Sequence, residues 1–410
     1  MSAVEWTGVP IQVVGIGADG WAGLGERAKV AVEGCEVVFG SARQLALLPS
    51  GTAERIAWPT PLLPAIAELL TRHADRCIGV LASGDPMFYG IGATLARLVG
   101  PQGLQVYPQP SSASLACARL GWPLAETPVV SVVARPLPTV LPELADRRRL
   151  LVLSENETTP AALAKLLCDN GFGGSTLTVL EQLGGESERT VTATAVDWSH
   201  PPGDPLNLCA VECVADPAHP RRTRMPGLRD DAFTGDGQLT KAEIRALTVT
   251  ALAPAPGELL WDVGGGSGTI AIEWCRTHPS CRAVTFERLP ARRDQIAGNA
   301  RALGVPGIVV RGELRAELAE DATPAPDAIF LGGGLTQDGL FDDCWRRLRP
   351  GGRLVANAVT AESEARLLSW SHRYGGTLRK FQIYRGEALG GFTAWRPQLP
   401  VAQWTVTAPR

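Results

Sequence analysis

The segment ELLWDVGGGSGTIAIEW, residues 258–274, has the pattern of a buried strand, a glycine-rich turn and a helix. Asp262 ends the apolar run, and Gly264, Gly266 and Gly268 follow at alternate positions. Glycines between a strand and a helix let the backbone come close to a bound nucleotide. The same stretch also satisfies the G-x-G-x-x-A fingerprint of nicotinamide-binding proteins, with alanine in the third place. The motif alone therefore leaves both NAD(P) and S-adenosylmethionine (SAM) open.

The strands that follow favour SAM. RAVTFER, residues 282–288, places Glu287 at a strand end, where it can accept from the ribose hydroxyls of either cofactor. Asp262 is a fixed anion beside the loop, and it suits an ammonium or sulfonium better than a pyrophosphate. PDAIFLGGG, residues 326–334, adds a glycine turn at the sheet crevice where a methyl group and its acceptor would meet. LRPGGRLVANAV, residues 348–359, resembles a turn and strand that recur in class I methyltransferases. A two-domain NAD(P)-dependent oxidoreductase is the alternative.

The first half of the chain has its own α/β pattern. From Gln12 to about Val214, short apolar runs alternate with helical stretches. VVGIGADG, Val13–Gly20, fits G-x-G-x-x-G letter for letter, but we interpret it as a structural turn, because any tight turn favours glycine. Residues 215–233 contain three prolines and paired charges and are typical of a linker. We predict two α/β domains, residues 1–214 and 234–410, joined by the linker 215–233.

The composition indicates small-molecule partners. A formal net charge of -3 over 410 residues is too small to attract nucleic acid. The start of the chain lacks a signal-peptide pattern, and no apolar run approaches the ~20 residues that span a bilayer. We therefore expect a cytoplasmic protein with no membrane or nucleic-acid partner. The nine cysteines form no C-x-x-C pair, which indicates reduced thiols. Cys209 and Cys213 alternate with apolar residues as in a buried strand, and we predict no metal site.

A helix is predicted just before the glycine strand. Thr240 and Glu243 form a T-x-x-E capping box, in which the threonine accepts from a helical amide and the glutamate reaches back to the cap.

Longer stretches resemble known families. DDAFTGDGQLTKAEIRALTVTAL (230–252), NARALGVPGIVVRGELRAEL (299–318) and PGGRLVANAVTAES (350–363) resemble the decarboxylating precorrin methyltransferase domain of cobalamin biosynthesis, over about Leu228 to Arg410. In the first half, VVFGSARQL (37–45), VLASGDPMFYGIG (80–92) and later motifs resemble class III tetrapyrrole methylases. Both halves in this order resemble the fused precorrin-6Y C5,15-methyltransferases (decarboxylating).

This resemblance implies a fold and a reaction. The fold is a class III tetrapyrrole methylase with two α/β subdomains, followed by a class I Rossmann-like methyltransferase. Two molecules of SAM would methylate C5 and C15 of precorrin-6B (precorrin-6Y), the ring C acetate would lose carbon dioxide, and the products would be precorrin-8 and S-adenosylhomocysteine. The N-terminal half would act at C5, and the C-terminal half at C15 and in decarboxylation. A homo-oligomer, such as a tetramer, is expected.

The resemblance also suggests site residues. Methyl transfer from SAM requires positioning and exclusion of water rather than a nucleophilic side chain. The expected SAM contacts of the C-terminal half are Asp262, Gly264, Gly265, Gly266, Ser267, Gly268 and Glu287, with Thr240 and Glu313 as second-rank contacts. The expected contacts of the N-terminal half are Gly84, Asp85, Ser111 and Ser112. Suggested catalytic residues are Asn357, Thr360 and Glu362. Lys241 and Arg245 are candidates to bind substrate carboxylates. A non-catalytic tetrapyrrole carrier is a further alternative.

Overall fold

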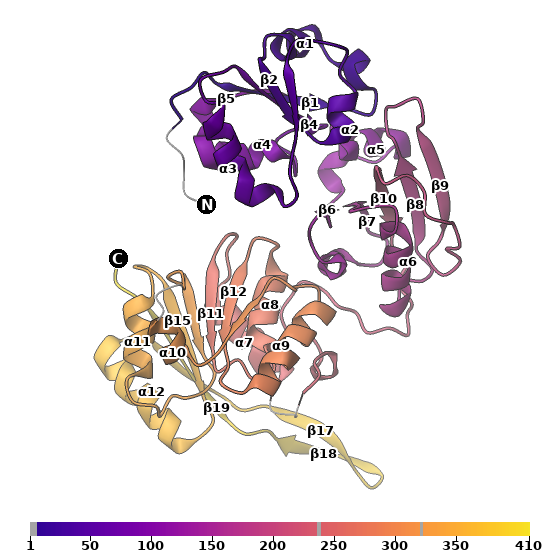
Figure 1. Cartoon of the computed structure of the whole chain (residues 1–410). Coiled ribbons are helices and arrows are strands. Elements are labelled where there is room, and N and C mark those ends of the chain that lie inside the picture. Colours follow the sequence, from indigo (N-terminus) through magenta and orange to yellow (C-terminus); the bar gives the residue numbers. More distant parts are fainter. Residues whose placement is uncertain (1–5, 236–238, 320–322) are drawn as a thin grey trace. The chain divides into compact units, whose positions relative to one another are not determined.

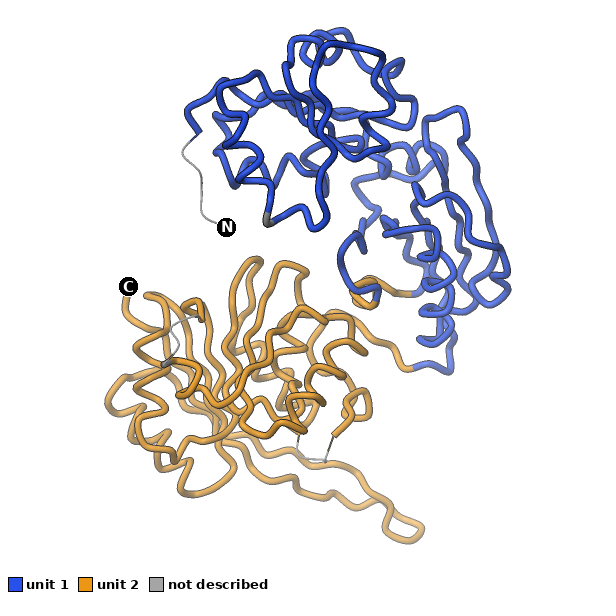
Figure 2. The backbone as a smooth tube through the Cα atoms, viewed as in Figure 1, with its two compact units in different colours: residues 1–137, 146–219 blue, residues 138–145, 220–410 orange. Residues whose placement is uncertain are grey.

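The computed structural model describes residues 6–235, 239–319 and 323–410 (Figure 1). Residues 236–238, which belong to the motif before the glycine strand, lie outside the described residues. The chain forms two compact units (Figure 2). The first contains Met1–Leu137 and Asp146–His219, and the second contains Pro138–Ala145 and Pro220–Arg410.

The first unit begins with a parallel five-stranded sheet in the order β3-β2-β4-β1-β5. Its strands are β1 (Ile11–Ile16), β2 (Val37–Gly40), β3 (Glu54–Ala57), β4 (Ile78–Ser83) and β5 (Leu104–Tyr107). Its helices are α1 (Glu26–Glu33), α2 (Ala42–Ala46), α3 (Leu62–Arg72) and α4 (Ile91–Val99). The central strands consist almost wholly of buried apolar residues, as expected for a parallel sheet with both faces covered.

A second sheet completes this unit in the order β6-β7-β10-β8-β9, and only its β6-β7 pair is parallel. Its strands are β6 (Val129–Ser131), β7 (Arg149–Leu153), β8 (Thr176–Glu181), β9 (Arg189–Thr194) and β10 (Asn207–Glu212), with α5 (Ser112–Leu120) and α6 (Thr159–Asp169). The two sheets are the two α/β subdomains that the sequence predicts.

The opening glycine motif is a strand and a turn, as predicted. After β1 the chain forms a short 3-10 helix, Gly20–Gly23, and α1 begins only at Glu26. Gly15 has no room for a side chain, because a Cβ there would lie 2.0 Å from the Gly84 carbonyl oxygen. This glycine therefore serves close packing between strand ends.

The second unit contains a seven-stranded sheet in the order β13-β12-β11-β14-β15-β19-β16. The first five strands are parallel, and β19 runs antiparallel between β15 and β16. The strands are β11 (Leu259–Val263), β12 (Arg282–Phe286), β13 (Val309–Arg311), β14 (Ala328–Leu331), β15 (Arg353–Ala358), β16 (Thr377–Phe381) and β19 (Val401–Thr407). A separate hairpin consists of β17 (Tyr384–Leu389) and β18 (Phe392–Pro397). This is the Rossmann-like arrangement expected from the sequence.

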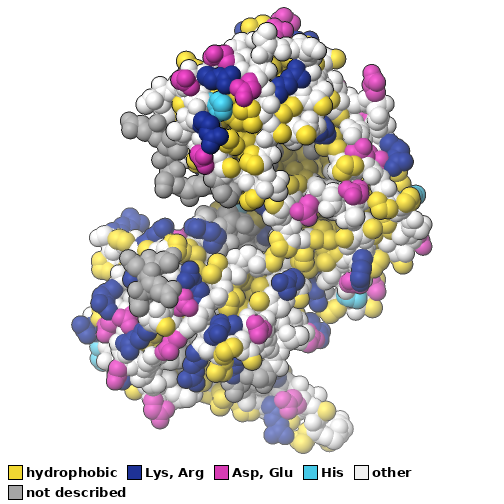
Figure 3. Space-filling view, viewed as in Figure 1, with side chains coloured by type: hydrophobic (Ala, Val, Ile, Leu, Met, Phe, Trp, Pro, Cys, Tyr) yellow, Lys and Arg dark blue, Asp and Glu magenta, His cyan; other side chains and the backbone are white. Residues whose placement is uncertain are grey.

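Helices cover both faces of this sheet (Figure 1). The helices are α7 (Ala242–Leu252), α8 (Thr269–Thr277), α9 (Pro290–Ala302), α10 (Leu314–Ala319), α11 (Leu340–Arg347) and α12 (Ala361–Tyr374). Leu260 packs in the core beneath α7, α8 and α9, whereas its neighbour Trp261 packs in the core beneath α10, α11 and α12. Successive strand residues thus alternate between the two cores. Basic and acidic side chains are interspersed over each unit on the face in Figure 3, consistent with the small net charge.

The predicted linker differs from the structure. The units change over between His219 and Pro220, and the rest of residues 215–233 belongs to the second unit. Leu228 and Phe233 are buried in its core, and the amide of Leu228 donates to Glu273 Oε1 at 3.0 Å. This packing is not recognisable in the sequence, because the buried apolar residues Leu228 and Phe233 lie among prolines and charged residues.

A segment from the first half also belongs to the second unit. Pro138–Ala145 packs against the turn after α9, where Gly304 adopts a left-handed backbone with φ of +82°. A Cβ on Gly304 would lie 2.4 Å from Pro142 Cδ and 2.9 Å from Leu141 Cβ. Glu143 of this segment also forms an ion pair with Arg224.

We expect Gly304→Ala to destabilise the second unit by about 1–3 kcal/mol, because alanine adds both backbone strain and a clash. Gly307→Ala is the matched control: no atom lies within 4 Å of its Cβ position, and we expect a change within about 0.5 kcal/mol. Hydrogen exchange of α9 peptides in a urea series measures both. Equal effects in the two variants would contradict the packing described.

Candidate functional site

A cavity of about 1100 Å³ lies at the carboxyl edge of the seven-stranded sheet. Its lining comes from the segments that follow β11, β12, β13, β14 and β15, from the start of α7 and from the base of the β17-β18 hairpin. The strand order reverses between β11 and β14, and open α/β sheets bind ligands at that point. The cavity is large enough for a nucleoside and part of a second ligand.

The glycine loop after β11 forms one wall of the cavity. The amides of Gly264 and Gly265 both donate to the Phe286 carbonyl oxygen, at 2.9 and 3.1 Å, which fastens the loop to β12. Gly264 has a φ of +79°, and a Cβ there would lie 3.0 Å from the amide nitrogen of Gly333. A side chain at position 264 would therefore crowd the loop after β14, so the close approach of the two loops depends on this glycine. Gly268 is the N-cap of α8 and Ser267 is buried beside it.

Asp262 is the buried carboxyl group of this wall. Only 1% of its surface is exposed, and its Oδ2 accepts from the Ala271 amide at 3.3 Å. Burial, opposed by the hydrogen bond from the Ala271 amide and assisted by the charge of Glu287, raises the pKa of Asp262 to about 7. A cationic ligand in the cavity would favour the ionised form.

Glu287 lies at the end of β12, as predicted, and lines the same cavity. One carboxylate oxygen accepts from the Gly266 amide and the other from the Leu289 amide, both at 3.0 Å. These bonds orient the carboxylate where a ribose is expected in this type of fold.

The remaining predicted residues of this half divide into two groups. Thr240, Glu313 and Asn357 line the cavity. Asn357 is held by its neighbours: its Nδ2 donates to Thr248 Oγ1 at 2.8 Å and its Oδ1 accepts from Gln403 Nε2 at 3.1 Å.

Thr360 and Glu362 do not line this cavity. Thr360 is the N-cap of α12 and its hydroxyl accepts from the Ser363 amide, while Glu362 is exposed in the first turn of that helix. Their residue types suit a helix start, and the sequence pattern did not separate that role from a catalytic one.

The predicted capping box is wrong. Helix α7 begins at Ala242, and its N-cap is Lys241, whose side chain makes no capping bond. Asp230 provides the cap from outside the helix, because its Oδ1 accepts from the Ala242 amide at 3.0 Å. Glu243 instead forms an ion pair with Arg385 of β17 at 2.7 Å, and this guanidinium lowers the pKa of Glu243.

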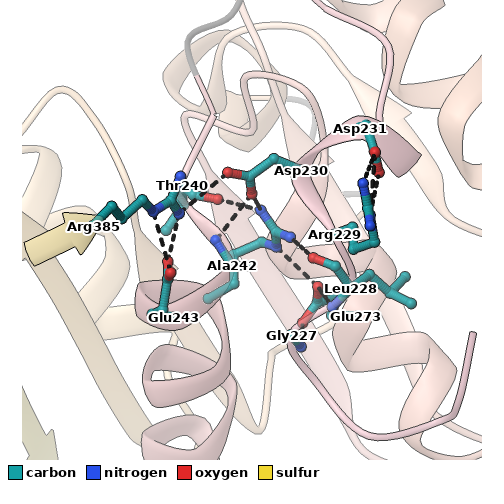
Figure 4. Close-up of polar contacts among 11 residues, drawn as sticks. Gly227, Leu228, Arg229, Asp230, Asp231, Thr240, Ala242, Glu243, Glu273 and Arg385 are labelled. Carbon is teal, nitrogen blue, oxygen red and sulfur yellow. Dashed lines mark hydrogen bonds and ion pairs between the residues drawn. The ribbon is translucent and has the colours of Figure 1, made fainter. Parts of the chain in front are cut away.

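The prediction that Arg245 binds substrate is also wrong. Its side chain is fully buried, and its Nε donates to Glu273 Oε1 and its Nη1 to Asp230 Oδ1, each at 2.8 Å. Figure 4 labels these two carboxylate partners. It also donates to the backbone carbonyls of Thr240 and Leu228. All of these bonds hold the segment before α7 against α8, so Arg245 fixes the position of the cavity-lining Thr240.

The cavity is also lined by the cationic residues Lys241, Arg288, Arg292 and Arg315. Among them, only Lys241 was predicted from the sequence. Arg288 directly follows Glu287, and Arg315 lies two residues after Glu313, so their places after strand ends were an available signal. Arg315 is engaged by Asp343 at 2.8 Å. The hairpin base, including Ile383 and Leu399, also lines the cavity and had no local sequence signal.

Comparison with known proteins agrees with this architecture. Residues 231–408 match the precorrin methyltransferase domain family, and residues 10–197 match the tetrapyrrole (corrin/porphyrin) methylases. The precorrin-6Y C(5,15)-methyltransferase [decarboxylating] of Mycobacterium tuberculosis (strain CDC 1551 / Oshkosh) is 51% identical over 97% of this chain and 99% of that protein. The enzyme of the same name from Sinorhizobium sp is 48% identical over 97% of this chain and 96% of that protein.

The chain belongs to the precorrin-6Y C5,15-methyltransferase (decarboxylating) family.

Membership of this family makes the chain a SAM-dependent C-methyltransferase, and the oxidoreductase alternative is not supported. A solved C-terminal domain of a family member from Rhodobacter capsulatus is 42% identical, covers 45% of this chain and 100% of that domain, and has a TM-score of 0.43. No helix within the described ranges is long and apolar enough to cross a membrane.

The first unit of this family member brings its four predicted residues together. Gly84 follows β4 with a φ of +59°, and a Cβ there would lie 3.0 Å from the Pro110 carbonyl oxygen and 3.6 Å from the Ser112 amide. Asp85 Oδ1 accepts from the Met87 amide at 2.8 Å, and Ser111 caps α5 by accepting from the Ser114 amide. The turns after β4 and β5 thus meet at one sheet edge, although Asp85 and Ser111 both make local structural bonds.

We expect Arg245→Met to lower the free energy of unfolding of the second unit by about 3–5 kcal/mol, because Glu273 would remain buried without its cation. Arg229→Met is the matched control, since Arg229 and its partner Asp231 are exposed and such surface ion pairs contribute little to stability. Urea unfolding of both variants compares them. A loss below 1 kcal/mol for Arg245→Met would show that the buried network is not stabilising.

Proposed function

We propose that this chain catalyses the C5 and C15 methylations of precorrin-6B (precorrin-6Y) in cobalamin biosynthesis, with decarboxylation of the ring C acetate to give precorrin-8. The observation that carries the proposal is the convergence of Asp262, Gly264–Gly268 and Glu287 on one cavity at the strand reversal. The near full-length match to relatives of this name supports the reaction.

We assign one SAM to this cavity. Glu287 would accept from the ribose hydroxyls, and the glycine loop would pack against the methionine portion, because no side chain there blocks a close approach. Asp262 would accept from the ammonium group or face the sulfonium. These two carboxylates fit the ligand, because SAM carries a sulfonium group, an ammonium group and a ribose diol.

The acceptor would occupy the part of the cavity near Asn357 and the hairpin base. Attack of an electron-rich meso carbon on the methyl group needs alignment and a dry site. Asn357 is a suitable contact because Thr248 and Gln403 fix the orientation of its amide. Lys241, half-buried at the start of α7, would bind an acceptor carboxylate in place of the buried Arg245.

We assign C15 methylation and decarboxylation to the second unit and C5 methylation to the first. The motif resemblance of each half supports this division. Gly84, Asp85, Ser111 and Ser112 would line the second SAM site, at the edge where the turns after β4 and β5 meet. S-adenosylhomocysteine would be the product at both sites. The homo-oligomer stays a prediction.

Asp262→Ala should abolish most C15 methylation and the decarboxylation, while C5 methylation continues. Loss of a charge-assisted contact to the cofactor should weaken binding by about tenfold to a hundredfold. Incubation with precorrin-6B and labelled SAM, followed by mass spectrometry with fragment assignment, measures each step. Asp342→Ala, which changes an exposed carboxylate on α11, is the control. Loss of both methylations together would indicate one shared site, and an unchanged substrate mass in the wild type would indicate a carrier.

Affinity of the second unit for S-adenosylhomocysteine should fall below pH 7. The raised pKa of Asp262 means that the empty site is protonated at lower pH, whereas the ligand ammonium favours the carboxylate, so binding must release the proton. We expect about a five- to tenfold loss of affinity for each pH unit below 7, and no further gain well above it. Calorimetry from pH 5.5 to 8.5, with Asp262→Asn subtracted to remove the first unit's contribution, tests this. The same slope in Asp262→Asn would assign the titration to another group.

A further inference from the structure

Tyr89 has an unusual backbone for an aromatic residue. It lies in the loop after β4, four residues beyond Asp85, with a φ of +53°. This left-handed region is strained for residues other than glycine, asparagine and aspartate. Burial does not compensate for the strain, because 49% of the Tyr89 surface is exposed. The fold therefore holds an aromatic ring at the surface in a conformation that a glycine would adopt without strain.

The Tyr89 side chain and the loop that carries it are both anchored. The Tyr89 hydroxyl donates to the Val129 carbonyl oxygen at 2.9 Å, and Val129 belongs to β6, the edge strand of the second sheet. The preceding Phe88 packs into the core formed by α5 and that sheet. Met87, before it, is again exposed. Phe88 thus anchors the loop in the core, whereas Met87 faces outward. Tyr89 connects the two α/β subdomains of the first unit through its hydroxyl group.

Arg135 lies beside this ring. It follows Ala134, another non-glycine residue in the left-handed region, in the loop after β6. Its guanidinium carbon is 5.7 Å from the centroid of the Tyr89 ring. Arg135 is exposed, and it has no ion-pair partner within residues 6–235, 239–319 and 323–410. A cation without a carboxylate thus adjoins a half-exposed aromatic ring, and the exposed Met87 lies two residues before that ring in the chain.

We infer that Met87, Tyr89 and Arg135 form the contact surface for the tetrapyrrole acceptor in the first unit. A conjugated macrocycle offers a flat apolar face that packs against Tyr89 and Met87, and its carboxylate side chains complement Arg135. Met87 and Tyr89 are on the same loop as Gly84 and Asp85, so an acceptor on this surface would lie next to the proposed methyl donor. This inference rests on the proposed C5 methylation.

The test uses the full-length protein with precorrin-6B and labelled SAM. Initial rates of C5 methylation are measured over a range of acceptor concentrations for Arg135→Gln and Tyr89→Gly. Tyr89→Gly relieves the backbone strain while it removes the ring, so the variant should fold. Arg97→Gln, an exposed arginine on α4 whose Nε donates to the Ala93 carbonyl, is the control.

We expect both variants to raise the KM for the acceptor at least tenfold, with kcat and thermal stability close to the wild type, and Arg97→Gln to change none of these. Unchanged KM in both variants would overturn the inference. A fall in thermal stability or kcat without a rise in KM would also overturn it, because Tyr89 would then be only a structural tie between the subdomains. A wild-type protein that does not methylate C5 would overturn the proposed function itself, and this outcome is distinguished by the wild-type measurement alone.

Discussion

The buried ion pair between Arg245 and Glu273 is the interaction on which the C-terminal site depends. Neither side chain is accessible to water, so each charge is tolerable only because the other is present. The same guanidinium binds Asp230 and the carbonyls of Thr240 and Leu228, and Asp230 in turn caps α7. The chain that enters the unit is thereby fixed against α8, and α8 begins at the glycine loop. The glycine loop and the cavity-lining segment at Thr240 are therefore both positioned by this one set of bonds.

The sequence predicted the parts of the site that depend on local pattern. A buried strand followed by alternating glycines requires a turn with left-handed backbone, and the structure has it at Gly264, Gly266 and Gly268. Glu287 was placed correctly because the end of the next parallel strand must lie at the same sheet edge. The two α/β units followed from the alternation of apolar runs with helical stretches. These features are determined by residues close to one another in the chain.

The errors concern residues whose partners are distant in the chain. The sequence around Arg245 is typical of an exposed cation near a helix start. In the structure Arg245 is buried, because it pairs with Glu273, which lies 28 positions away. Thr240 matches a capping box, yet the cap comes from Asp230. The hairpin base that lines the cavity comes from residues beyond 380, and no local sequence pattern predicts its place at the site. Side-chain pairing across such separations follows from tertiary packing, which a single sequence does not display.

The segment Pro138–Ala145 has a consequence for dissecting the chain. A cut made at the apparent boundary near residue 220 separates this segment from the unit whose surface it covers. A C-terminal fragment that starts there would expose the left-handed turn at Gly304 and leave Arg224 without the carboxylate of Glu143. The second unit is therefore not one continuous segment of the chain, because eight of its residues come from within the first half. A fragment bounded by the sequence alone would lack these residues of its own surface.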